Sequence, residues 1–413
     1  MPAPLDGIRV IDMSRVLAGP SCGQTLADLG AEVIKIERPG QGDDTRGWGP
    51  PFLADRHGND TSDAAYYLAA NRGKRSVLAD IASAEGQAMI KALVADADVL
   101  LENFKVGQLA RYGLDYNSLH AINPRLIYCS ITGFGQTGPL AHRAGYDFVI
   151  QGMSGFMSIT GEADDQPGGG PQKAGVAISD LMTGMVSAQA ILAALLHRER
   201  GGTGQYIDMA LLDVMVTSLA NMNTNFLVSG KPPHRWGNAH PNVVPYQTFK
   251  ASDGWIIVAA GNDGQFRKLC AAGGCPQIAD DPRFASNALR IRHRADLIPA
   301  LAQMIERKSQ ADWISELERV GVPCGPINDL AQVFEMPQIH ARGLRVDIER
   351  DDAGPVPLVG SPIKFSATPV RYDLPPPRLG QHTEQVLREV LGYDDSQVTA
   401  YLKTVADGKG DPA

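Results

Sequence analysis

A strand, a glycine-terminated helix and a second strand follow one another near the start of the chain, and this pattern limits the possible folds most strongly. Residues 8–12 and 32–36 are apolar runs, and between them a Gly-Pro turn leads into a helix expected at 21–29 that ends at Gly30. Strands joined through a helix in this way lie parallel in one sheet. The chain is therefore expected to build an α/β fold.

The same alternation continues to about residue 198. Strands are expected at SVLADI, DVLLEN and RLIYCSITGFG, and helices at AEGQAMIKALVADA and near residues 106–112. Repeated units of this kind predict a doubly wound, Rossmann-like domain around a parallel sheet. Its first turn, LAGPSCG, lacks the GxGxxG spacing of dinucleotide sites, which argues against an NAD-linked oxidoreductase.

The chain is too long for one hydrophobic core, since it has 413 residues. A loop rich in Pro, Trp, His and Gly interrupts the pattern at residues 230–246 and marks a change of domain. The predicted organisation is a large α/β domain at 1–198, a linker helix at 199–229, a smaller α+β domain at 230–330, and a segment at 331–413 that returns to complete the large domain.

Charge and cysteine usage exclude several classes of protein. A net charge of −8 disfavours nucleic acid as the main partner. The N-terminus has no signal-peptide pattern and no run reaches bilayer length, so a cytoplasmic enzyme without a membrane partner is expected. Five cysteines without a CxxC pair fit reduced packing residues, and nine histidines without HExxH spacing predict no bound metal.

Several polar residues follow the predicted strands, where α/β proteins place their sites. Arg38 comes after the second strand and suits a phosphate of 3′-phosphoadenosine, or it is an ordinary surface arginine. Asn103 and Phe104 end a buried strand, where Asn103 either meets a ligand or caps a helix. Tyr146 and Asp147 enter a further helix.

Asp180 follows a short buried strand expected at residues 174–179 and stands where a long helix begins. Helix N-termini favour anions, so this carboxylate is expected to stay ionised and nucleophilic. The alternative is a carboxylate that only caps the helix.

Taken in order, these segments resemble the class III CoA-transferase family over nearly the whole chain. The motifs that carry the resemblance are DGIRVIDMSRVLAGPSCGQTLADLGAEVIKIERPGQGDDTRGWGPPF, NRGKRSV, LLENFKVGQLARYGLD, NPRLIYCSITGFGQTGP, GVAISDLMTG, GVPCGPIND and LGQHTEQVL. The resemblance implies an enzyme that moves CoA between carboxylic acids. It also implies an interlocked homodimer that acts on acyl-CoA without a metal or a nucleoside triphosphate.

Within this resemblance Asp180 matches the nucleophile that forms an aspartyl-CoA thioester. The residues that match the CoA site are Val16, Leu17, Ala18, Arg38, Ala79, Asp80, Ile81, Ala82, Asn103, Phe104, Lys105, Arg111, Tyr146 and Asp147. One position departs from the pattern, because Ala144 replaces a lysine found in some members. A 2-methylacyl-CoA racemase is the alternative, but such enzymes use a histidine where this chain has Tyr146, and a phenol with a pKa of about 10 is a poor base.

The loop HRWGNAHPNVVPYQTF and the segment RAGYDF look like the succinyl-CoA:glutarate transferase branch. A dicarboxylic acid needs a cation for its second carboxylate, and Arg46, Arg235 and His240 are the candidates. Succinyl-CoA is the expected donor and glutarate the expected acceptor. Itaconate, citramalate, malate, 3-hydroxy-3-methylglutarate and oxalate are the alternative acids.

Overall fold

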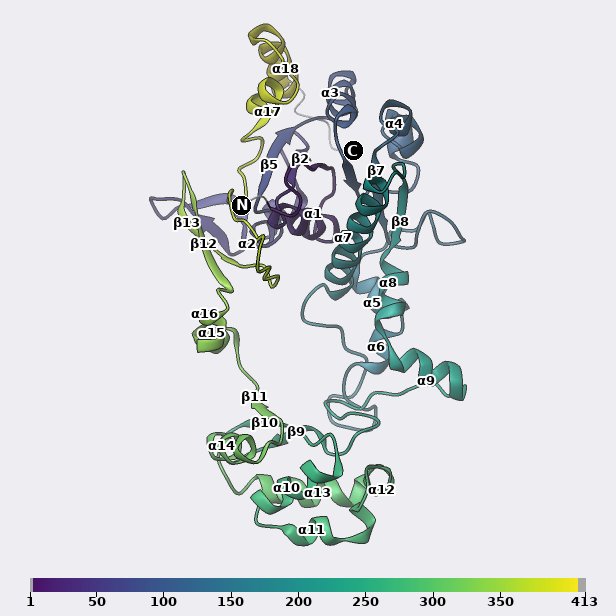
Figure 1. Cartoon of the computed structure of the whole chain (residues 1–413), viewed down its shortest axis with the longest axis vertical. Coiled ribbons are helices and arrows are strands. Elements are labelled where there is room, and N and C mark those ends of the chain that lie inside the picture. Colours follow the sequence, from purple (N-terminus) through teal and green to yellow (C-terminus); the bar gives the residue numbers. More distant parts are fainter. Residues whose placement is uncertain (1–2, 408–413) are drawn as a thin grey trace. The chain divides into compact units, whose positions relative to one another are not determined.

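The computed structural model describes residues 3–407, which form two compact units (Figure 1). The large unit combines residues 3–156, 174–224 and 340–407. The small unit combines residues 157–173 and 225–339. The four segments expected from the sequence stay a prediction of domain organisation. The structure adds that residues 157–173 group with the small unit although they precede it by about fifty positions in the chain.

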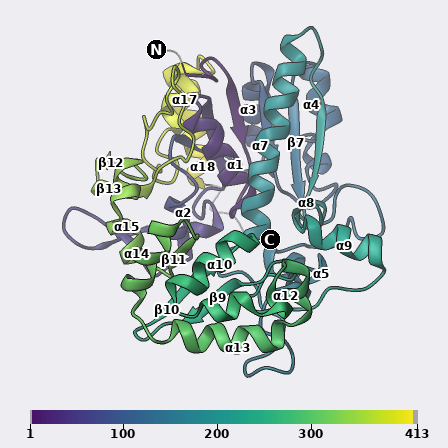
Figure 2. The same cartoon turned by 60° about the horizontal axis from the view of Figure 1, so that its bottom comes forward.

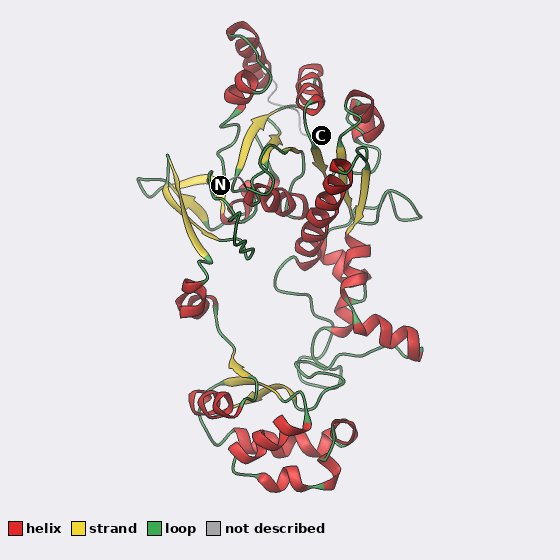
Figure 3. Cartoon of the chain, in the orientation of Figure 1, coloured by secondary structure: helices red, strands yellow, loops and turns green. Residues whose placement is uncertain are grey.

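A six-stranded parallel sheet is the centre of the large unit (Figures 1 and 3). Its strands lie side by side in the order β5 (Lys74–Leu78), β2 (Glu32–Glu37), β1 (Arg9–Asp12), β6 (Val99–Glu102), β7 (Ile127–Thr132) and β8 (Tyr206–Ala210). Every neighbouring pair is parallel. Counted along the chain, the order is 3-2-1-4-5-6, the arrangement of the doubly wound dinucleotide-binding fold.

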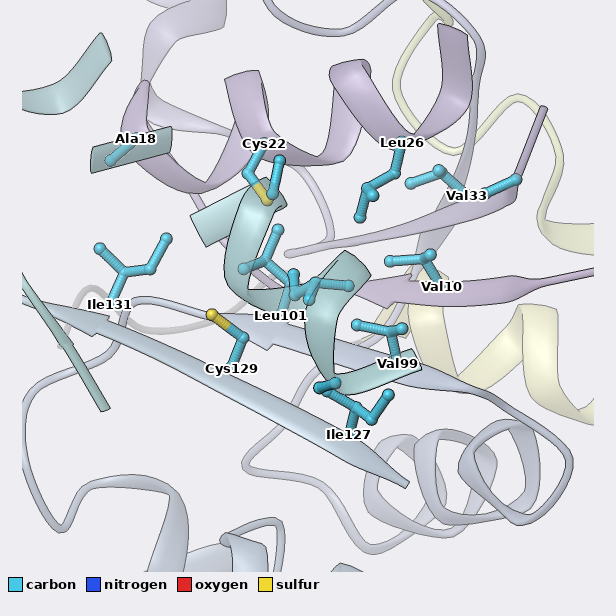
Figure 4. Close-up of a cluster of buried hydrophobic side chains, with 14 of the residues drawn as sticks. Val10, Ala18, Cys22, Leu26, Val33, Val99, Leu101, Ile127, Cys129 and Ile131 are labelled. Atoms are coloured by element: carbon cyan, nitrogen blue, oxygen red, sulfur yellow. The ribbon is translucent and has the colours of Figure 1, made fainter. Parts of the chain in front are cut away.

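Helices cover both faces of this sheet, because successive strand residues are apolar and alternate between the faces. On one face, side chains of α1 (Ala18–Asp28), α5 (Asp147–Met153), α7 (Ile178–Glu199) and α8 (Leu211–Ser218) pack on Val10, Val99 and Ile127 (Figure 4). On the other, α3 (Ala84–Ala95), α4 (Tyr116–Ile122), α17 (Thr383–Glu389) and α18 (Asp395–Asp407) pack on Ile11 and Leu100. The parallel sheet and the mixed α/β class predicted from the sequence are confirmed.

The first face depends on a close approach of α1 and α7, which lie against each other in both views (Figures 1 and 2). Gly184 of α7 makes this possible, because a Cβ at that position would lie 2.2 Å from Ser21 Oγ and 2.6 Å from the Ala18 carbonyl oxygen. Within the described chain, α7 is also the one helix long and apolar enough to cross a membrane. Its contacts with α1 and the sheet make it a core helix of the large unit.

Shorter elements complete the large unit. Two antiparallel pairs join β3 (Phe52–Ala54) to β4 (Asp60–Ala64) and β12 (Arg345–Arg350) to β13 (Gly354–Val359). Single helical turns are η1 (Asp44–Gly47), α2 (Ala65–Leu68) and η2 (Leu109–Tyr112). The linker helix expected at 199–229 is wrong as a single element, because this segment contains strand β8, helix α8 and helix α9 (Asn221–Ser229). The strand escapes detection since YIDMA is short, carries a charge and runs directly into a helix.

The small unit has a three-stranded antiparallel sheet in the order β11 (Cys324–Pro326), β10 (Trp255–Ala259), β9 (Tyr246–Lys250). Its core includes the buried side chains of Phe266, Leu301 and Trp313. Its helices are α10 (Asp263–Ala272), α11 (Pro276–Asp280), η3 (Pro282–Phe284), α12 (Asn287–Arg292), α13 (Arg294–Ile305), α14 (Gln310–Val320) and α15 (Leu330–Glu335). Two further helices, α6 (Phe156–Ile159) and α16 (Pro337–Ala341), lie where the chain passes between the units. All five cysteines of the chain are free thiols, and four of them are buried.

A buried chain of charges links the C-terminal segment to the loop after β2. Arg46 donates to Glu37 at 2.7 Å and to Asp63 at 2.5 Å, and Arg350 of β12 donates to the other oxygen of Asp63 at 2.7 Å. The Arg46 guanidinium also lies 3.8 Å from the centre of the Tyr67 ring. These side chains are at most 4% exposed, so each charge depends on its partners for solvation.

We predict that Arg46→Leu lowers the free energy of unfolding by about 3–5 kcal/mol, because it leaves Glu37 and Asp63 buried with too little positive charge. Chemical denaturation measures the change. The control Arg345→Ala removes an exposed pair with Asp347 and should cost about 0–1 kcal/mol. Equal losses in the two variants would contradict a structural role for the buried charges.

Candidate active site

Two adjoining cavities of the large unit open where the order of the sheet reverses, between β1 and β6. The first has a volume of about 220 Å³ and the second about 420 Å³. Residues that directly follow the carboxyl ends of β1 and β6 line both of them. In open α/β sheets this crevice is the usual place for a ligand.

The cavities gather most of the residues predicted from the sequence. The first is lined by Val16, Leu17, Ala18, Asn103, Phe104, Lys105, Tyr146, Asp147 and Asp180. The second is lined by Arg38, Ala79, Asp80, Ile81, Ala82 and Phe104. Arg111 lines neither cavity, whereas the adjacent Tyr112 lines the second.

The loops after β1 and β6 are tied together by one side chain. The Asn103 amide accepts a hydrogen bond from the Arg15 backbone N–H at 2.9 Å and donates to the Arg15 carbonyl at 2.7 Å. The neighbouring Glu102 carboxylate accepts the Phe104 backbone N–H at 2.7 Å, and burial raises the pKa of this carboxyl to about 7. Asn103 therefore holds the shape of the crevice through its amide, and it is not a helix cap.

The turn after β1 has a strained backbone, and the buried ion pair of Asp43 with Lys35 stabilises it. Val16 has a φ of 71°, a conformation that β-branched residues rarely adopt. Its backbone N–H donates to the Asp43 carboxylate at 3.2 Å, and that carboxylate also binds Lys35 at 2.9 Å. Both charged side chains are fully buried, and their pairing keeps the pKa of Asp43 at about 2. An ionised Asp43 thus fixes the turn that forms one wall of the first cavity.

Asp180 is the third residue of α7, and Asp147 of α5 takes the role of the cap. The Asp147 carboxylate accepts the Ser179 backbone N–H at 2.9 Å and the Ser179 hydroxyl at 2.5 Å. Residue Ala177 is the N-cap position and offers no side-chain bond. The strand expected at 174–179 is wrong, because only Ile178 and Ser179 have regular structure there and both belong to α7.

Burial and, to a smaller extent, the nearby negative charge of Asp147 together raise the pKa of Asp180 to about 7. The expectation that the helix N-terminus keeps this carboxyl fully ionised is therefore wrong. A first-turn dipole contributes on the order of 1 kcal/mol, which is less than about three pKa units of opposing shift. Asp180 is close to half protonated at neutral pH, so a small change in its surroundings changes its charge.

The basic side chains of the first cavity, apart from Lys105, are not among the residues predicted from the sequence. Arg15, Lys105, His142 and Arg143 line it with Asp180. Arg46 is wrong as an acid-binding residue, since its guanidinium is buried against Glu37 and Asp63. The small unit contains Arg235, which donates to the Glu162 carbonyl and binds Asp164, and His240, whose ring contacts Tyr246.

Tyr66 is a further residue that the sequence did not single out. Burial raises the pKa of its phenol, and Asp180 and Asp147 raise it further, which places the ring within electrostatic reach of both carboxyls. Its ring packs edge-on against Trp48 at 5.2 Å. No motif marks Tyr66, whereas Arg15 could have been found from its position three residues after the end of β1.

Comparison with known proteins identifies the family. The model of CoA-transferase family III matches residues 5–383. The chain belongs to CoA-transferase family III. The resemblance deduced from the sequence motifs is thereby confirmed, and the protein is an enzyme of the CoA-transferase type. Enzymes of this type use CoA thioesters as substrates.

Among its relatives, a succinate–glutarate CoA-transferase of Agrobacterium fabrum is 55% identical over 94% of this chain and 96% of its own length. The human succinyl-CoA:glutarate CoA-transferase is 43% identical over 97% of this chain and 89% of its own length. A crystal structure of a CaiB/BaiF family protein from Brucella suis is 51% identical, with a TM-score of 0.84 over 94% of this chain and 100% of its own. This family III transferase therefore shares its fold and nearly its full length with these proteins.

The titration of Asp180 predicts a pH-dependent effect on stability. The folded enzyme binds this proton more tightly than the unfolded chain, whose carboxyl has a pKa of 3.8. The raised pKa therefore supports folding at low pH and costs stability as the pH rises through about 7. Asp180→Asn should unfold at a higher temperature than the unaltered enzyme at about pH 8, with a smaller difference at about pH 5. The exposed control Asp60→Asn should show no such trend.

Proposed function

We propose that this transferase moves CoA between carboxylic acids through a covalent aspartyl-CoA thioester on Asp180. One observation carries the proposal. The Asp180 carboxyl lines a cavity that adjoins a second one lined by Arg38 and residues 79–82, the residues that the sequence predicted for the phosphoadenosine of CoA. The proposed nucleophile and the proposed cofactor-binding residues thus line two cavities of the large unit that share three lining residues.

The chemistry begins with attack of an ionised Asp180 oxygen on the thioester carbon of the donor. The C–S bond breaks, CoA leaves as its thiolate, and a mixed anhydride of Asp180 and the donor acid remains. The thiolate then attacks the Asp180 carbonyl, which releases the donor carboxylate and forms the aspartyl-CoA thioester. An acceptor carboxylate repeats these steps in reverse order. The thioester energy is kept throughout, so no nucleoside triphosphate is expected.

The surroundings of Asp180 suit this role. A carboxyl with a pKa of about 7 is a stronger base and nucleophile than an ordinary carboxylate, yet about half of it is ionised at neutral pH. Asp147 contributes in two ways, because its charge raises that pKa and its hydrogen bonds to Ser179 fix the first turn of α7. We assign Asp147 a positioning role rather than direct contact with CoA.

Intact-mass spectrometry tests the nucleophile. After mixing with succinyl-CoA, the enzyme should gain the mass of CoA minus water, and hydroxylamine should remove the adduct. Asp180→Asn should show no adduct and lose activity by several orders of magnitude. The matched variant Asp147→Asn should still form the adduct, at a reduced rate. An adduct that persists in Asp180→Asn would refute the assignment.

We further propose succinyl-CoA as the donor and glutarate as the acceptor. The names of the relatives at 55% and 43% identity support this choice. Relatives named for oxalate and D-citramalate are 40% and 35% identical, and they support these acids as alternatives. Arg143 and His142 are candidates in the large unit for the second carboxylate, and Arg235 and His240 of the small unit stay predictions.

A panel of acceptor acids tests this assignment. With succinyl-CoA as donor, glutarate should react at least about 10-fold faster than butyrate, which has no second carboxylate to satisfy a cation in the site. Arg143→Gln should reduce that preference without abolishing transfer to butyrate. The panel includes 3-hydroxy-3-methylglutarate, itaconate, citramalate, malate and oxalate, and products are separated by chromatography. Equal rates with glutarate and butyrate would contradict a dicarboxylate acceptor.

The number of subunits in the enzyme and its location in the cell are also matters of proposal. We propose an interlocked homodimer, which the resemblance implies. Exposed apolar side chains in the large unit, including Phe148, Met153 and Met185, offer surface for a second copy. Light scattering measures the molar mass in solution, which for a homodimer is twice that of the chain. A cytoplasmic location, expected from the sequence, stays a prediction.

A further inference from the structure

Arg15 stands on the partition between the two cavities. Three residues line both of them, namely Arg15, Phe104 and Gln108, and Arg15 is the cation among these. A ligand that occupies both cavities at once must pass this partition. The other basic residues are confined to one side, with Lys105 in the first cavity and Arg38 in the second.

The backbone of Arg15 is fixed while its side chain remains accessible. Both backbone polar groups are held by the Asn103 amide, at 2.9 Å and 2.7 Å. The guanidinium lies 5.6 Å from the centre of the Phe104 ring, and the Arg15 side chain is 48% exposed. Its ion pair with Asp44, at 3.1 Å, is also open to solvent, with Asp44 33% exposed. An exposed ion pair of this kind contributes little to stability, so Arg15 can release the Asp44 carboxylate and bind a more highly charged anion in its place.

CoA carries an anionic group that can meet Arg15 at this partition. This inference rests on the proposed function. Its phosphoadenosine and its thioester are joined by a diphosphate followed by the uncharged pantetheine arm. With the thioester at Asp180 in the first cavity and the phosphoadenosine beside Arg38 in the second, this linking chain crosses the partition, and the diphosphate is its anionic part. A planar guanidinium binds phosphate oxygens through two parallel hydrogen bonds. We propose that Arg15 binds the diphosphate of CoA and exchanges Asp44 for it when the substrate enters.

Truncated donors separate this role from a general effect on the site. The probes are succinyl-CoA, succinyl-3′-dephospho-CoA and succinyl-pantetheine, of which only the last lacks the diphosphate. Arg15→Gln should lower kcat/KM for the first two donors by roughly 10- to 100-fold, the range for loss of a charge-assisted contact, chiefly through KM. It should leave kcat/KM for succinyl-pantetheine within about twofold. Arg15→Lys keeps the charge but lacks the planar guanidinium, so its kcat/KM for succinyl-CoA should lie between those of Arg15→Gln and the unaltered enzyme.

Arg125→Gln is the matched control. Arg125 is exposed, pairs with Glu199 and lines neither cavity, and its replacement by Gln changes the net charge by the same amount as Arg15→Gln. It should resemble the unaltered enzyme with every donor. Circular dichroism checks that the Arg15 variants are folded. Equal losses with succinyl-CoA and succinyl-pantetheine, or no loss with either, would overturn the role of Arg15 and leave the proposed function intact. Failure of the unaltered enzyme to bind CoA in calorimetry would instead overturn both.

Discussion

The site depends on the reversal of strand order between β1 and β6, and one amide joins the two sides of that reversal. From β1 the sheet continues toward β2 and β5, and from β6 toward β7 and β8. The loops after β1 and β6 therefore diverge, which leaves a crevice at the carboxyl ends of the strands. The Asn103 amide spans this crevice at its base through the backbone of Arg15.

The carboxyl that performs the proposed chemistry is held in surroundings that oppose its ionisation. Asp180 is buried in part and lies near the negative charge of Asp147, so the enzyme gives up some folding stability at neutral and alkaline pH to keep it there. The same residue, Asp147, stabilises the first turn of α7 through Ser179. Burial is thus the larger cause of the raised pKa of Asp180, and Asp147 contributes to both its pKa and its position.

Much of the fold could be read from local patterns, because alternating apolar strands and helices with glycine stops are short-range signals. The ranges expected for the first two strands agree with the structure to within one residue at each end. Strand β8 and the loop before α7 were missed or misassigned because their sequences are short and ambiguous. The grouping of residues 157–173 with the small unit depends on contacts that no local pattern contains.

In the candidate site, too, some features could be predicted from the sequence and others could not. Most cavity residues were predicted, but chiefly through the resemblance to a family, since their local sequences allow surface or capping roles as well. Arg46 shows the limit of sequence position. It lies in a glycine-rich loop that suggests exposure, and its true partners Glu37, Asp63 and Tyr67 lie up to 21 positions away. The protonation of Asp180 could not be deduced either, because the opposing effects of a helix terminus and of burial can be weighed only in three dimensions.

The pairing of Asp63 with Arg350 also has a consequence for the order of events during synthesis. These residues are separated by 287 positions, and helices α17 and α18 lie further along the chain while contributing to the core on one face of the sheet. All residues of the small unit precede residue 340. A ribosome therefore releases the whole small unit before the large unit has received its last buried arginine or two of the four helices that pack on one side of its sheet. Until then, this face of the sheet is apolar surface without its full cover, which a nascent chain can leave exposed or present to a chaperone.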